Sequence, residues 1–166
     1  MSDDPASALA QHIRCEFRRR LIGEQLPRIT RCAQLLDDDR IWLRPSQNTN
    51  SVGNLILHLV GNTTQWILAE FSDLEDLRQR DQEFSTQGGH TVTELIAMLS
   101  STYTRACDTV DSVSLDQLLA KRTVQGYTET GVSVILHVLE HSSNHAGQIY
   151  AWTKQTTGID LAFYDL

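Results

Sequence analysis

The sequence predicts an all-α protein, a four-helix bundle that forms one domain over residues 1–166. Four stretches carry apolar residues at helical spacing, and no convincing pair of alternating strands competes with them. A chain of 166 residues is long enough to bury one core but short for two. Packing four amphipathic helices together is the simplest way to remove their apolar stripes from water. The loops are long enough to permit a crossover, so their lengths leave the topology open.

The first helix is expected over residues 6–36, where apolar side chains recur near one side. Pro27 lies inside this stretch, and a proline there lacks the helical N–H while its ring clashes with the preceding turn. We therefore expect the helix to kink or divide near Gly23 to Leu26. The apolar side is formed by Leu9, Ile13, Phe17, Leu21, Ile29, Cys32 and Leu36.

The second helix is expected from about Ser51 to Phe71. The segment before it, DDDRIWLRPSQNTN, is typical of a loop because of Pro45 and its Asn and Ser content. Residues 72–90 are acidic and polar and end near two glycines, which predicts a surface connection. A third helix follows and runs to about Val110. Its start is indicated by Thr91 or Thr93, either of which offers a capping hydroxyl, and by Glu94 in the first turn.

The helical pattern weakens over residues 111–131. The stretch SLDQLLAK is compatible with a short helical turn, and RTVQGYTET with a small hairpin or an irregular loop, so both possibilities stay open. The final helix is expected from about Val132 to Thr157. Gly158 follows it as a plausible glycine at the C-terminal end, and an apolar and aromatic tail completes the chain.

The composition predicts a folded, cytoplasmic protein. Apolar residues make up 40% of the chain and charged residues 21%, which is ordinary for a folded protein. No apolar run reaches the roughly 18 to 20 residues of a membrane span, and the N-terminus lacks the basic and apolar regions of a signal peptide. Cys15, Cys32 and Cys107 form no CxxC pair and leave one cysteine unmatched, which favours a reduced compartment and a role as small core residues.

The charge balance argues against nucleic acid as the main partner. The formal net charge is −7, and the one tight basic cluster consists of Arg18, Arg19 and Arg20. Neutralising phosphates requires a broad positive surface. We expect a small-molecule substrate, with no nucleic acid and no membrane as partner.

Three histidines recur every fourth residue in HVLEHSSNH, within the last helix. Residues four apart in an α-helix lie about 40° from each other and roughly 6 Å apart along the axis, so His137, His141 and His145 ascend one side. Two imidazoles at this spacing can reach one ion at roughly 2.0 to 2.1 Å. A third ligand must come from another helix.

His58 is the best candidate for this third ligand, because its stripe on the second helix is unusually polar for a bundle core. A polar stripe that faces inward needs groups to satisfy it. Taken alone, His58 is better explained as a hydrogen-bonded core histidine, and it is the ladder on the last helix that favours the metal. The other members of the stripe are Asn54, Gly61, Asn62 and Gln65.

A competing motif is the inverted zinc protease pattern HxxEH, which His137, Glu140 and His141 fit. That pattern requires a further acidic ligand on a later helix. After Glu140 the chain contains no glutamate and only Asp160 and Asp165, both in the tail, so the protease interpretation is disfavoured. The chain also lacks a GxSxG elbow and a glycine-rich phosphate loop.

Two segments resemble the DinB-like superfamily. They are WLRPSQNTN with NSVGNLILHLVGNTTQWI around His58, and HVLEHSSNHAGQIYAWTKQTTGIDLAFY around His141 and His145. The resemblance implies a four-helix bundle with an up-down-down-up order and a divalent ion, nickel or zinc, held by these three histidines. It places His137 beside the ligands or on the substrate side. Relatives include a mycothiol-dependent maleylpyruvate isomerase, bacillithiol transferases and proteins described as metal-dependent hydrolases.

The resulting hypothesis is an enzyme, a hydrolase or a thiol-dependent transferase, whose ion activates water or a low-molecular-weight thiol. His137 and Glu140 are its catalytic candidates. One alternative is a non-catalytic bundle whose helices are joined by the metal, and another is a metal-free bundle that works through partners. We also expect a homodimer, from the apolar tail, the bundle faces and the resemblance. The predicted substrate pocket contains Asn62, Trp66, Asn144 and Gln148.

Overall fold

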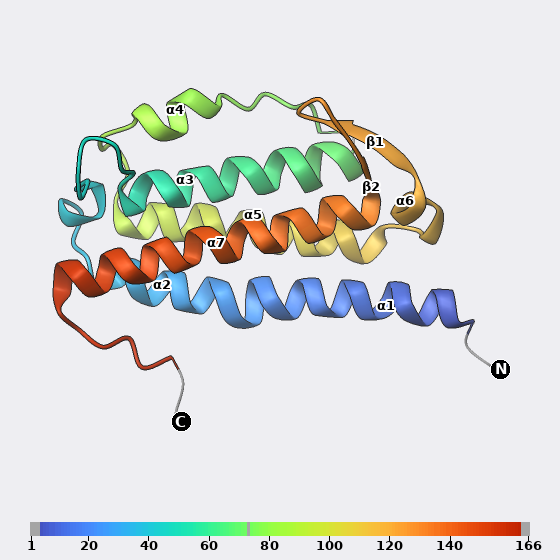
Figure 1. Cartoon of the computed structure of the whole chain (residues 1–166), viewed down its shortest axis with the longest axis horizontal. Helices are drawn as coiled ribbons and strands as arrows, with labels where there is room; N and C mark the ends of the chain where they lie inside the picture. The colour runs from blue at the N-terminus through green and yellow to red at the C-terminus, as the bar shows by residue number, and fades with distance from the viewer. Residues whose placement is uncertain (1–3, 73, 164–166) are drawn as a thin grey trace.

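Four long helical segments pack side by side in the computed structural model, which describes residues 4–72 and 74–163 (Figure 1). The helical elements are α1 (Pro5–Arg18), η1 (Arg19–Gln25), α2 (Leu26–Gln34), η2 (Arg40–Trp42), α3 (Val52–Thr63), η3 (Thr64–Ala69), α4 (Arg80–Ser85), α5 (Val92–Ser112), α6 (Leu115–Leu119) and α7 (Gly131–Thr157). Two strands, β1 (Lys121–Val124) and β2 (Tyr127–Thr130), form a small hairpin. The all-α helical bundle predicted from the sequence is confirmed.

The directions of the long segments can be followed in Figure 1. The α1–α2 segment and α7 run one way along the bundle, whereas α3 and α5 run the opposite way, which gives the order up, down, down, up. Residues 74–91 therefore return along the outside of the bundle before α5 begins. Contacts of α3 with α5 and α7, and of α2 with the same two helices, enclose the core. Its fully buried side chains include Phe17, Leu21, Ile29, Ile56, Leu59, Leu95, Leu99, Tyr103 and Ile135.

The first helical segment changes type before Pro27 instead of breaking. η1 has π-helical hydrogen bonding, and Gln25 and Leu26 keep right-handed helical backbone angles. Pro27 then follows as the second residue of α2 and has no N–H to donate, while the preceding residue, Leu26, still donates its N–H to the Leu21 carbonyl oxygen of η1. The predicted interruption near Gly23 to Leu26 is thus a π-helical segment.

Side-chain caps fix the starts of α3 and α5. The Ser51 hydroxyl accepts a hydrogen bond from the Asn54 N–H at 3.1 Å, and the Asn54 side chain accepts one from the Ser51 N–H at 3.2 Å. Thr91 and Glu94 form the same reciprocal pair at the start of α5. This confirms Thr91 as the capping residue and Glu94 as its partner.

Residues 111–131 contain the short helix that SLDQLLAK suggested and, of the two possibilities left open for RTVQGYTET, the hairpin. Residues 115–119 form the helix α6, and β1 pairs antiparallel with β2 in a hairpin. Gln125 and Gly126 form its turn with φ angles of 51° and 83°, as a two-residue hairpin turn with left-handed backbone requires. α7 follows directly and ends at Gly158, which has a left-handed φ of 70° as predicted.

Two of the three cysteines are core residues. Cys32 and Cys107 are buried, and burial raises the pKa of their thiols to about 11 and about 12. Cys15 is exposed, so the prediction of a core position is wrong for this residue. Among the described residues, no helix combines the length and the apolar character that crossing a membrane requires.

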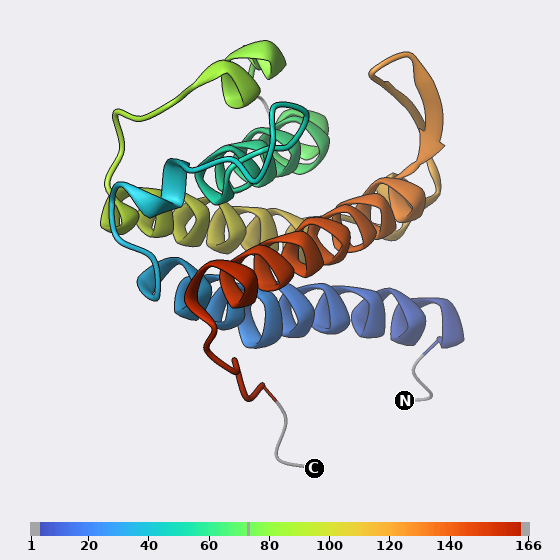
Figure 2. The same cartoon turned by 60° about the vertical axis from the view of Figure 1, so that its left-hand side comes forward.

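The connection before α5 is more than the surface loop expected from its polarity. α4 lies along the outer side of α3 in both views (Figure 2) and contacts it. Glu83 of α4 is buried at 9% exposure. The prediction of a surface connection over residues 72–90 is therefore wrong at this point.

Candidate metal centre

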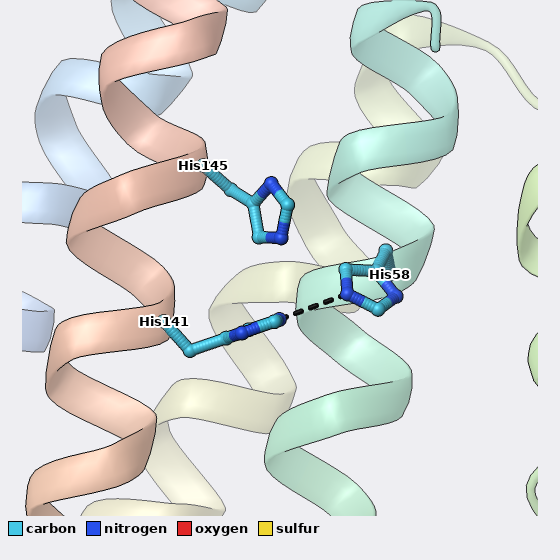
Figure 3. Close-up of side chains that lie close together, drawn as sticks. All are labelled: His58, His141 and His145. Atoms are coloured by element: carbon cyan, nitrogen blue, oxygen red, sulfur yellow. Dashed lines mark hydrogen bonds between the residues drawn. The ribbon is translucent and has the colours of Figure 1, made fainter. Parts of the chain in front are cut away.

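Three of the predicted histidines converge between two helices. His58 projects from α3, while His141 and His145 project one turn apart from α7, and the three rings point toward one another (Figure 3). One nitrogen of each ring lies within 4.8 Å of the others. The Nε2 atoms of His58 and His141 are 2.8 Å apart.

The electrostatic surroundings favour neutral imidazoles. Burial, together with the neighbouring His145 and His58, lowers the pKa of His141 to about 3. Burial also lowers the pKa of His145. A neutral imidazole offers a lone pair to a metal, whereas a protonated one does not.

The donor set fits a transition-metal ion. Zinc, nickel, iron and copper all accept imidazole nitrogen, which bonds zinc at roughly 2.0 to 2.1 Å. Two ligands of one ion then lie at most about 4.2 Å apart, so small side-chain rotations are enough to bring nitrogens within 4.8 Å of one another into range. His58 Nε2 and His141 Nε2 also face each other closely enough that a proton or a cation must lie between them.

A buried ion pair lies behind His58. Glu83 Oε2 is 2.8 Å from His58 Nδ1, and Arg78 donates to both Glu83 oxygens, from Nε at 2.7 Å and from Nη2 at 2.9 Å. Burial opposes ionisation of Glu83. The hydrogen bonds from Arg78 and His58, together with the charge of Arg78, outweigh it, so the pKa of this carboxyl lies below its usual value.

Residues of the polar stripe of α3 contact Glu83 and Arg78 and leave space for them. A Cβ at Gly61 would lie 1.9 Å from Glu83 Oε1, so only glycine leaves room for the carboxylate. The Asn54 side-chain amide donates to the carbonyl oxygens of Glu83 at 2.9 Å and of Thr86 at 2.7 Å. Gln65 Oε1 accepts from Arg78 Nη1 at 2.9 Å. Two polar members of the stripe, Asn54 and Gln65, are thus hydrogen-bonded to the connection and its ion pair, and Gly61 leaves space for the carboxylate.

Sequence reasoning missed Glu83 and Arg78. The available signal was weak: a glycine one turn after His58, on the same stripe, marks a close approach of some other group. Nothing local identifies that group, because Glu83 follows His58 by 25 residues in a segment without hydrophobic periodicity.

The remaining residue of the ladder, His137, lies one turn before His141 and stacks on Trp66 with ring centroids 3.7 Å apart. Its Nε2 is 3.4 Å from Asn62 Nδ2, and burial lowers its pKa. Among the described residues, Asn62 Oδ1 and Trp66 Nε1 are buried without a hydrogen-bond partner. The predicted pocket residues Asn62 and Trp66 are therefore brought together with His137.

The other predicted site residues lie at the surface. Gln148 is exposed, and its Oε1 is 3.1 Å from His145 Nδ1. Asn144 is exposed, and Glu140 is exposed and lines a groove of about 660 Å³ with Arg20 and Glu24, where α7 meets η1. The structure thus places Gln148 beside a histidine of the group and Glu140 on another face of α7.

The acidic residues weighed for a protease are not part of the group. Asp160 is exposed in the segment after α7, and Asp165 lies outside the described residues.

The helical bundle has the same fold as solved proteins that are described as DinB-like. Two solved structures share the fold: the DinB-like protein YjoA from Bacillus subtilis, at 12% identity with a TM-score of 0.66, and a DinB-like protein from Bacillus cereus, at 10% identity with a TM-score of 0.66. The first match covers 87% of this chain and 94% of the other chain, and the second covers 84% and 89%.

Residues 12–163 match the family described as Protein of unknown function (DUF1572), and the chain belongs to that family. A search of curated proteins gave no match.

Proposed function

We propose that the protein is a metal-dependent enzyme, a hydrolase or a thiol-dependent transferase, in which His58, His141 and His145 hold a divalent ion. The observation that carries this proposal is the convergence of three half-buried or buried imidazoles from α3 and α7. Nickel and zinc are the ions we expect first, since both accept nitrogen ligands.

A bound divalent ion supplies a positive charge that lowers the pKa of a water or thiol nucleophile. The three imidazoles do not neutralise that charge, because burial keeps at least His141 and His145 uncharged at neutral pH. Three protein ligands also correspond to the open arrangement of catalytic sites, whereas structural zinc sites have four. A low-molecular-weight thiol is the second substrate we expect for a transferase.

The residues beside the histidines are suited to contact a small-molecule substrate. Asn62 offers an acceptor and Trp66 a donor that have no other partner among the described residues. His137 stacks on Trp66. It lies one helical turn before His141, and the ring centroids of these two histidines are 5.4 Å apart. Gln148 contacts His145 and is suited to orient that ring.

The first experiment is elemental analysis of protein purified without a histidine tag or added metal, followed by turnover assays. We expect one ion per chain, and activity with thiols and electrophilic acceptors or with simple esters and amides. His145→Ala should lose more activity than the roughly 10- to 100-fold typical for residues that only support a ligand. His12→Ala, a change at an exposed histidine of α1, is the matched control.

The absence of bound metal together with no uptake on titration would overturn the proposal. Full turnover in His145→Ala would remove that residue from the mechanism.

A second candidate is a metal site without catalysis that joins segments of the bundle. It is favoured by the position of His58, which contacts His141 of α7 on one side and Glu83 of α4 on the other. This candidate predicts that the metal-free chain loses its fold, as structural zinc domains do.

A further inference from the structure

We propose that Glu83, held in place by Arg78, positions His58 as a metal ligand by fixing the proton of the imidazole on Nδ1. This inference rests on the proposed metal site. It adds two positioning residues from the connection before α5, a segment to which the sequence motifs assign no role.

The contact with Glu83 determines which nitrogen of His58 is free. An ionised carboxylate only accepts hydrogen bonds, so the 2.8 Å contact with Oε2 requires a proton on His58 Nδ1. The Nε2 atom then carries the lone pair, and this is the atom that faces His141. The tautomer set by Glu83 is therefore the one that can bind a metal between α3 and α7.

Arg78 could favour the opposite tautomer, because its Nη2 lies 3.1 Å from the same Nδ1. In that arrangement Nδ1 accepts a hydrogen bond from Arg78 Nη2, and the imidazole proton lies on Nε2, which then has no lone pair for a metal. The 2.8 Å contact between Nδ1 and Glu83 would then hold no proton. Arg78 Nη2 already donates to Glu83 Oε2 at 2.9 Å, so in the first arrangement it has an acceptor other than Nδ1, and the 2.8 Å contact between Nδ1 and Glu83 holds a proton.

The geometry of the ion pair makes Glu83 a rigid partner. Arg78 binds the carboxylate through two nitrogens and two oxygens, a fork that fixes orientation as well as distance. The side chains of Arg78 and Glu83 are only 4% and 10% exposed. Two residues of α3 hold Glu83 in place: Gly61 leaves space for its carboxylate, and the Asn54 side-chain amide donates a hydrogen bond to its backbone carbonyl oxygen.

Stability alone does not account for such a pair. The desolvation cost of a buried ion pair often cancels its attraction, and well-packed apolar residues commonly replace it without loss. A buried pair in contact with a member of the histidine group is better explained by its effect on that histidine. A purely structural role would attach α4 to α3 and leave the His58 tautomer and the metal affinity unaffected.

The test measures zinc affinity by competition with a chromophoric chelator. We expect Glu83→Ala to bind zinc roughly 10- to 100-fold more weakly than the wild type, as is typical when a carboxylate behind a histidine ligand is removed. Glu83→Gln should lose less zinc affinity, because its amide oxygen can still accept a hydrogen bond from the Nδ1–H of His58. Asp81→Asn is the matched control, since Asp81 is an exposed carboxylate of the same short helix.

Nitrogen NMR of the metal-free protein gives a readout that a structural role would not change. The wild type and Asp81→Asn should show His58 protonated on Nδ1. Glu83→Ala should shift His58 toward protonation on Nε2. An unchanged tautomer in a folded Glu83→Ala protein would overturn the proposal.

If Glu83→Ala does not fold, the double variant Arg78→Met, Glu83→Leu can be used in its place to test the effect of Glu83 on zinc affinity. It removes both charges and leaves no unpaired one in the interior. We expect it to fold and to lose zinc affinity to the same extent as Glu83→Ala. Wild-type affinity in the folded double variant would refute the positioning role.

The outcomes also separate this inference from the proposed function. A wild type that binds zinc without turnover would contradict catalysis and leave the role of Glu83 intact. A wild type that takes up no zinc would overturn both.

Discussion

The position of the Glu83 carboxylate depends on the absence of a side chain at Gly61 of α3. A methyl group there would approach Glu83 Oε1 to 1.9 Å and Cδ to 2.8 Å, and the carboxylate cannot retreat without leaving Arg78 or His58. We predict that Gly61→Ala folds, because alanine is favoured over glycine in a helix by about 1 kcal/mol. It should nevertheless bind zinc more weakly than the wild type, as measured by chelator competition.

Gly147→Ala is the control for this prediction. Gly147 lies in α7, and a Cβ there would meet nothing within 4 Å. This variant should gain roughly 0.5–1 kcal/mol in free energy of unfolding, from the helix preference alone, and keep its zinc affinity. If Gly61→Ala behaved in the same way, the space at Gly61 would not matter to the site.

The site residues divide into those that sequence can reveal and those that it cannot. His141 and His145 follow from a helical repeat, and His58 from its place in a polar stripe, because in both cases neighbours on one helix report on the same face. Glu83 and Arg78 act across 25 and 20 positions from a segment with no repeat. Their role depends on how the connection folds back over α3, which no local pattern records.

At the level of single elements, Glu94 stabilises the first turn of α5 as the partner of the Thr91 cap. The Thr91 N–H and hydroxyl hydrogen bond to this carboxylate, and they hold its pKa below the model-compound value of 4.5. A lowered pKa in the folded state means that the interaction stabilises the protein above pH 4.5 and is lost as the pH falls through the folded value.

We therefore predict that Glu94→Ala lowers the free energy of unfolding at pH 7, and that the difference from the wild type shrinks in acid. Urea unfolding at neutral pH and near pH 3 would measure it. Glu94→Gln is the control, because its amide accepts the Thr91 hydrogen bond at every pH. An Ala variant whose deficit is the same in acid would contradict the role of the charge.

Helix boundaries proved easier to predict than helix type. Thr91 and Gly158 are local signals whose effect is confined to one turn. The π-helical segments η1 and η3 were not predicted, and Thr64–Ala69 contains no glycine or proline that would indicate a change. Hydrogen bonding of that kind is decided by packing against neighbouring helices, which the sequence of one helix does not contain.

For the whole molecule, a bound ion should act as a stabilising ligand. Binding to the folded state adds about 2.7 kcal/mol when the free ion is at 100 times its Kd. For a chain of this size about 1 kcal/mol shifts Tm by roughly 2–4 °C, so we expect zinc to raise Tm by roughly 5–11 °C and a chelator to reverse the shift. Thermal unfolding followed by circular dichroism would measure this.

The same experiment discriminates between the two candidate functions. His145→Ala should show little response to zinc, which serves as the control. A metal-free protein that stays folded favours the catalytic proposal, whereas one that is unfolded at ambient temperature favours a metal that joins the helices.

Four amphipathic stripes were enough to predict the bundle, because burying them leaves few arrangements. The order of helix directions came from the DinB-like resemblance, since loops long enough for a crossover permit several orders. The homodimer stays a prediction.

The close fit between Gly61 and Glu83 ties together two positions that a reader of sequences would treat separately. A bulkier residue at the first excludes a carboxylate at the second, so the two positions should change together as the family diversifies. We therefore expect members with glycine three places after the α3 histidine to have an acidic residue 25 places after that histidine, as this chain does. In members that have neither the glycine nor the acidic residue, other groups must orient the α3 histidine. Such members should be considered separately before the same chemistry is assigned to them.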